Sequence, residues 1–123
     1  MILSAKEIEE FRVALKESPE ALETLDLVSA MDGNLEGAMG LLAPQYDIEF
    51  TRADNESIET IAKRFSKIIC DEDFIDDVMS GLLTAAVGAL AAAGQIPQAI
   101  ATPIVLYLAK KGVKKWCALQ KDS

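Results

Sequence analysis

The sequence VMSGLLTAAVGALAAAGQIPQAIATPIVLYLA, residues 78–109, contains no charged side chain over 32 consecutive positions. A segment that is apolar on every side is typical of a helix at the centre of a bundle or of a membrane span. As one helix it would be about 48 Å long, well beyond a hydrocarbon thickness of about 30 Å. Gly94 and Pro97 interrupt it, because glycine suits a helix C-terminus and proline cannot continue a helix interior. We therefore expect two shorter helices in a hairpin.

The first of these helices is rich in alanine and is predicted over residues 72–93. Its small residues recur every four positions, which lets helix backbones approach closely. We therefore expect a buried central helix against which its neighbours pack. The second helix is predicted to open at Thr102 and Pro103, as N-cap and first-turn residue, and to continue to about Ala118. The two rows of small residues are Ser80, Thr84, Gly88 and Ala92, and Gly81, Ala85, Ala89 and Ala93.

The residues before this hairpin predict amphipathic helices separated by caps and turns. Ser4 and Glu7 form the pattern of a capping box, and Ser18 followed by Pro19 is typical of a second helix start. The chain is thus predicted to be all-α, a single compact domain of about six helices over residues 1–123. The predicted helices span residues 5–17, 19–31, 35–42, 55–69, 72–93 and 103–118. Residues 44–53 alternate apolar and polar side chains as a short strand does, but a strand would have no pairing partner, so an extended loop is favoured there.

Charge is divided unevenly along the chain. Residues 1–77 carry 19 of the 20 acidic side chains and a net charge of −12, whereas residues 78–123 carry a net charge of +4. Clusters of opposite sign favour pairing between surfaces, so the acids of one copy could meet the lysines of another. The predicted interface residues are Asp71, Asp73, Asp76, Asp77, Lys110, Lys111, Lys114, Lys115 and Trp116.

Composition excludes several classes of chemistry. The chain has no histidine, which rules out Ser-His-Asp and Cys-His catalysis and histidine-ligated zinc. Its net charge of −8 argues against a nucleic-acid partner, which requires a basic surface. The acids of residues 71–77 lack the glycine and the final glutamate of a calcium loop, and no glycine-rich phosphate motif is present. We therefore predict no enzyme activity and no catalytic, cofactor-binding or metal-ligating residues.

The two cysteines, Cys70 and Cys117, are 47 positions apart and form no C-x-x-C pair. A single disulfide would be fewer than a small secreted scaffold usually carries. The chain becomes polar at Ser4, so the apolar segment of a signal peptide is not seen. We therefore predict a cytoplasmic protein with two reduced, packed thiols.

Residues 32–42, DGNLEGAMGLL, resemble the turn and last helix of ubiquitin-associated (UBA/CUE-like) helical modules. The shared pattern is glycine, asparagine or aspartate, a hydrophobic residue and glutamate, followed by alanine and leucine at helical spacing. The Met-Gly-Phe or Met-Phe-Pro loop with which those modules bind has no match upstream. The resemblance therefore implies a turn and a helix here, without ubiquitin binding.

Three functions fit these features. The first is a small soluble interaction or regulatory module without catalytic activity, whose unknown protein partner could be a second copy of the chain. The second is a membrane-active protein that inserts its 78–109 hairpin, with the lysines remaining on the side of entry. The third is a small-ligand binder with a pocket lined by the small residues of the alanine-rich helix.

Overall fold

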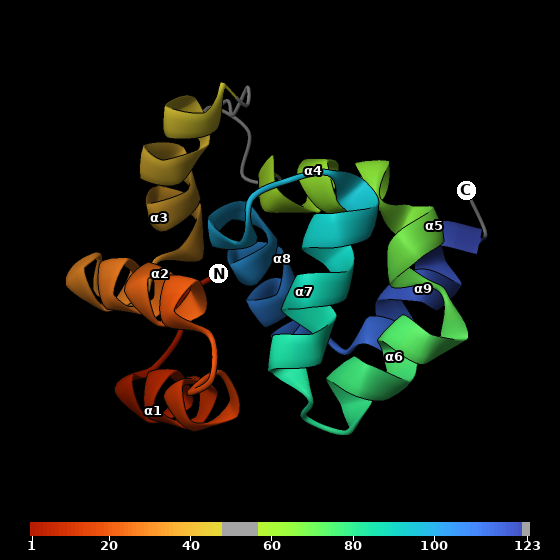
Figure 1. Ribbon diagram of the computed structural model, residues 1–123, viewed down its shortest axis with the longest axis horizontal. Coiled ribbons are helices and arrows are strands. Elements are labelled where there is room, and N and C mark those ends of the chain that lie inside the picture. The colour runs from red at the N-terminus through yellow and green to blue at the C-terminus, as the bar shows by residue number, and fades with distance from the viewer. Residues whose placement is uncertain (48–56, 122–123) are drawn as a thin grey trace.

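The computed structural model describes residues 1–47 and 57–121, and every regular element within them is helical, as predicted (Figure 1). Nine α-helices and one 3₁₀ helix form in this part of the chain rather than about six, because several predicted helices are divided. The elements are α1 (Ala5–Ala14), α2 (Pro19–Ala30), α3 (Leu35–Leu42), the 3₁₀ helix η1 (Ala43–Tyr46), α4 (Ser57–Arg64), α5 (Ser66–Ile69), α6 (Glu72–Met79), α7 (Leu83–Gly94), α8 (Gln98–Lys111) and α9 (Val113–Lys121).

The first two helices begin where their caps predict. The Ser4 hydroxyl accepts a hydrogen bond from the Glu7 amide at 3.1 Å, and the Glu7 carboxylate accepts one from the Ser4 amide at 2.9 Å. The Ser18 hydroxyl accepts from the Ala21 amide at 3.3 Å, with Pro19 as the first residue of α2. The side chains thereby satisfy amide groups that have no partner inside the first helical turn. Both predicted starts are confirmed.

The N-terminal segment is fixed against the turn that precedes α3. The Leu3 amide donates to the Gly33 carbonyl at 2.8 Å, and the Leu35 amide donates to the Met1 carbonyl at 3.2 Å. Gly33 has a φ of +84°, and a Cβ at this position would clash with the Leu3 carbonyl. The predicted turn at residues 32–34 is therefore present, and the close approach of the N-terminal segment requires its glycine.

Helix α8 forms the centre of the fold. Every residue from Ile100 to Leu108 is buried, and α2, α3, α4, α6, α7 and α9 all pack against this helix. A helix surrounded by others can be apolar on every side, which explains the uninterrupted apolar sequence of this segment. The aliphatic side chains of α8 bury more apolar area per residue than alanine can, so they take the central position.

The interior of α8 contains a proline. The helix begins at Gln98, so Pro103 lies within it and not at its first turn as predicted. Proline lacks the amide that would donate to the carbonyl four residues earlier, which here belongs to Ala99. The hydroxyl of Thr24, a buried residue of α2, donates to the Ala99 carbonyl at 3.4 Å. This bond joins α2 to α8 and satisfies the acceptor that the proline leaves without its usual donor.

The predicted helix over residues 72–93 is two helices, because the chain turns at Gly81 with a φ of +79°. The second of them, α7, is buried on one side and exposed on the other. The prediction that the alanine-rich helix is buried at the centre is therefore wrong for its exposed side. Helix α7 instead covers one side of α8 (Figure 1). Its buried residues are Leu83, Ala86, Val87 and Leu90, and its exposed residues are Ala85, Ala89, Ala92 and Ala93.

The middle of the chain also differs from the prediction. The helix predicted over residues 55–69 is divided at Phe65, between α4 and α5. The loop predicted over residues 44–53 starts as the 3₁₀ helix η1, and Asp47 after it adopts a left-handed conformation. The rest of that loop and the predicted start of the next helix, at residue 55, lie outside the described residues.

The bond between Thr24 and Ala99 can be tested by Thr24→Val, which removes the hydroxyl and keeps the shape of the side chain. We expect the free energy of unfolding to fall by about 1 kcal/mol, because the half-buried Ala99 carbonyl loses its donor. Urea denaturation followed by circular dichroism measures the change.

A second variant isolates the cause. Pro103→Ala restores a backbone amide that can donate to Ala99, so Thr24→Val should destabilise the protein less in the Pro103→Ala background. An equal loss in both backgrounds would contradict the role assigned to the hydroxyl.

Candidate interaction surfaces

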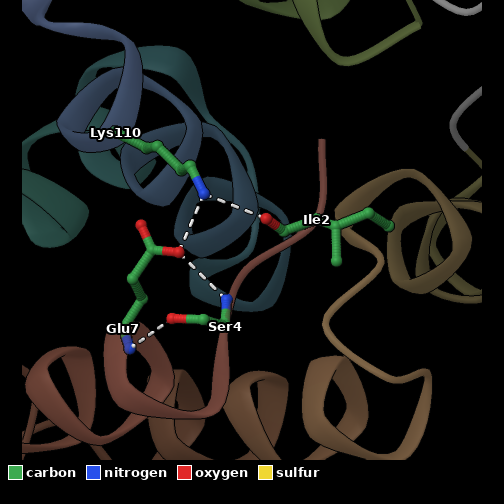
Figure 2. A network of polar contacts seen from close by, with 4 residues as sticks. All are labelled: Ile2, Ser4, Glu7 and Lys110. Atoms are coloured by element: carbon green, nitrogen blue, oxygen red, sulfur yellow. Dashed lines mark hydrogen bonds and ion pairs between the residues drawn. The ribbon is translucent and has the colours of Figure 1, made fainter.

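Lys110, a predicted interface residue, is engaged within its own chain. Its ammonium donates to the Ile2 carbonyl at 2.9 Å and to the Glu7 carboxylate at 2.8 Å, and the same Glu7 oxygen accepts from the Ser4 amide (Figure 2). The hydrogen bond from Lys110 is the largest cause of a lowered pKa at Glu7, followed by the bond from the Ser4 amide. The three interactions join the end of α8 to the N-terminal segment and to the first turn of α1.

The other predicted lysines do not share one helix face. Helix α8 ends at Lys111 and α9 begins at Val113, with Gly112 between them at a φ of +94°. The Lys111 ammonium lies 5.8 Å from the centroid of the Tyr107 ring, a cation–π distance. Lys114 and Lys115 are exposed on α9. The four lysines near the C-terminus therefore form two separate pairs, one at the end of α8 and one on α9.

Trp116 is part of the core. It is only 3% exposed, and its indole Nε1 has no hydrogen-bond partner among the described residues. An aromatic side chain in this position stabilises the attachment of α9 through its buried area. In this conformation the indole is not available to a partner.

The two cysteines form a disulfide, Cys70–Cys117, so the prediction of reduced thiols is wrong. Sequence spacing carries no information about their distance, whereas the packing of α9 against α5 and α6 brings them together. The disulfide lines a surface pocket with Asp76 of α6 and Lys114 of α9. Predicted acidic and basic residues therefore share a pocket within one chain, although no ion pair joins these two side chains.

The acidic residues of α6 occupy different positions on the helix. Asp71 is its N-cap, and its carboxylate accepts from the Asp73 amide at 3.1 Å. Asp76 and Asp77 lie in the last turn, because α6 ends at Met79. Carboxylates in a last turn lie near the negative end of the helix dipole, which disfavours them. The dipole therefore favours the acids at the start of α6 and not those at its end.

A surface that the sequence did not reveal lies on the outer side of α7, which we call the α7 face. It begins with two large apolar side chains at the α6–α7 turn, Met79 at 60% and Leu82 at 56% exposed. Exposed alanines continue it along the helix, and none of its residues is charged. The only sequence signal for this surface is the regular spacing of small residues in α7, which predicts packing against other helices of the same chain rather than an exposed face. The α7 face consists of Met79, Leu82, Ala85, Ala89, Ala92 and Ala93.

Residues 1–47 and 57–121 contain neither a metal-binding cluster nor a membrane-spanning helix. No group of three or more acidic or cysteine side chains in these ranges is arranged to hold a metal ion. No helix within them combines the length and the apolar character needed to cross a bilayer. The chain matches no protein-family model, no curated protein and no solved structure. The proposals below therefore depend on its own geometry.

The contacts of Glu7 predict a pH dependence of stability. Because its pKa is lowered in the folded state, Glu7 stabilises the protein at pH values above its ordinary pKa, and this contribution is lost as the pH falls through the folded-state value. Glu7→Gln should therefore be less stable than the wild type at neutral pH and should approach it in acid. Urea denaturation across the acidic range measures this difference.

The matched control is Glu10→Gln, at an exposed position of the same helix that forms no ion pair with a described residue. Its stability should follow that of the wild type across the same pH range. A stability difference between Glu7→Gln and wild type that does not change with pH would contradict the role of the Lys110 contact.

The disulfide predicts a redox dependence of stability. Reduction should lower the free energy of unfolding by about 3 to 4 kcal/mol, since the bond closes a long loop in the unfolded chain. Urea denaturation with and without a phosphine reductant measures the loss, and the Cys70→Ala/Cys117→Ala double variant should not respond to the reductant. Two free thiols in protein purified without reductant would contradict the bond.

Proposed function

We propose that this chain is a small helical interaction module without catalytic activity, and that its partner is a second copy of itself bound through the α7 face. The supporting observation is the exposure of Met79 and Leu82 beside a helix face that has no charge. Contiguous exposed apolar surface is uncommon on monomers and is typical of association sites. The net charge of −8 disfavours contact between copies over most of the surface, whereas the uncharged α7 face avoids this repulsion.

Pairing through one face fits the usual symmetry of homodimers. In a two-fold dimer the same surface patch of each subunit contacts its counterpart. The exposed alanines at spacings of three and four residues allow two α7 helices to approach closely. Met79 and Leu82 would then supply the larger apolar side chains that anchor an interface.

The proposal changes two expectations drawn from the sequence. Lys110 would not act at the interface, because it already binds Glu7 and the N-terminal segment. The cytoplasmic location was expected together with reduced thiols, and the Cys70–Cys117 disulfide favours an oxidising compartment instead. The proposed association through the α7 face depends neither on Lys110 nor on the compartment.

Ala89→Arg tests the α7 face by placing a charge near its centre. Wild type should elute as a dimer in light scattering coupled to size exclusion, and Ala89→Arg should weaken that dimer by roughly tenfold or more, because the interface would bury an unpaired charge. Ala30→Arg adds the same charge at an exposed alanine of α2 and should leave the dimer intact.

Two results would contradict the proposal. One is a wild type that remains monomeric at the highest concentration reached. The other is a wild type that floats with anionic vesicles and associates only in their presence, which would support the membrane alternative.

A further inference from the structure

We propose that the two α7 helices of the dimer run antiparallel, so that the acidic end of each α7 lies against the basic end of the other. This inference rests on the proposed function and specifies the geometry and charge of the partner surface. The acidic end is α6, which leads into α7. The basic end is the α4–α5 junction, which lies beside the end of α7.

Helices α6 and α7 are joined closely at the acidic end. The Leu82 amide donates to the Asp77 carbonyl at 2.8 Å, which holds the start of α7 against the last turn of α6. Asp73 and Asp77 are four residues apart and therefore lie on one side of α6. They do not line the surface pocket that the disulfide shares with Asp76 and Lys114, and neither forms an ion pair with a described residue. Two like charges at this spacing repel each other, so an opposite charge from a partner would stabilise them.

Phe65 holds the α4–α5 junction, the basic end, against the end of α7. A Cβ at Gly94, the last residue of α7, would lie 3.0 Å from the Phe65 ring, so the end of α7 packs on the α4–α5 junction. Lys63, Arg64 and Lys67 flank Phe65 in sequence; all three are exposed, and none forms an ion pair with a described residue. Figure 1 shows α6 at the lower end of α7 and α4 and α5 toward its upper end.

Only one relative direction matches these charges. Helix α7 has 12 residues, about 18 Å, and Ala89 lies near its middle. Two such helices crossing near Ala89 in opposite directions place the acidic end of each copy near the basic end of the other, twice by symmetry. A parallel pair would place acids against acids and bases against bases, which opposes association. The charge distribution therefore selects the antiparallel dimer.

Charge reversal at each end tests the arrangement. Asp73→Lys/Asp77→Lys replaces both carboxylates on that side of α6 with lysines, so this side and the α4–α5 junction are both basic. Lys63→Glu/Lys67→Glu replaces two of the three cations of the junction with carboxylates, so both are acidic. Each variant alone should dimerise about tenfold or more weakly than wild type at low salt, because like charges then meet at both ends. An equimolar mixture of the two should form a heterodimer at least as tightly as wild type, since both end-to-end contacts are again opposite in sign.

Sedimentation velocity with one variant fluorescently labelled measures both the homodimers and the heterodimer, and circular dichroism confirms that each variant is folded. The variant that combines all four substitutions exchanges the two ends and should recover its homodimer. These results would support the antiparallel arrangement, and added salt should reduce the differences between variants.

The outcomes separate the two proposals. A dimer that Ala89→Arg breaks but that neither reversal weakens would overturn the antiparallel arrangement and leave the α7 face in place. Tighter binding of Asp73→Lys/Asp77→Lys to wild type than of wild type to itself would indicate parallel helices instead. A monomeric wild type would overturn the proposed function and this inference together.

Discussion

The buried helix α8, with a proline in its interior, is the constraint on which the fold depends. Six of the other helices pack against it, so any loss of its regular path would disturb the whole core. Pro103 removes one backbone donor from this helix, and Thr24 supplies a substitute from α2. A partly buried hydrogen bond between side chain and backbone thus permits an uninterrupted central helix, and it fixes the position of α2 along that helix at the same time.

The sequence predicts the helical class and several helix starts because these depend on local contacts. Ser4 and Ser18 each bond to an amide three residues further on, so their cap patterns are visible without knowledge of the fold. The prediction that Pro103 lies in the first turn of a helix is wrong, because its position depends on a contact that is distant in sequence. A proline at a helix start and one inside a helix look alike in sequence, and the donor that permits the second lies 75 residues away, on Thr24.

The candidate surfaces were harder to predict than the fold. Apolar sequence on every side does not reveal which of two neighbouring helices lies at the centre. The alanine-rich α7 was predicted there, although the aliphatic residues of α8 bury more apolar surface. Lys110 was assigned to an interface because it lies in a basic cluster, yet its partners Ile2 and Glu7 come from the other end of the chain. Such partners can only be identified from tertiary contacts.

Gly88 connects the stability of the single chain to its proposed association. It lies in the middle of α7, where glycine costs about 0.5 to 1 kcal/mol relative to alanine. A Cβ at this position would meet no described atom within 4 Å, so packing within the chain does not require a glycine. A second α7 crossing near Ala89 would provide such a reason, because the missing side chain lets the two backbones approach more closely. The proposed dimer would thus account for a glycine that packing within the single chain does not require.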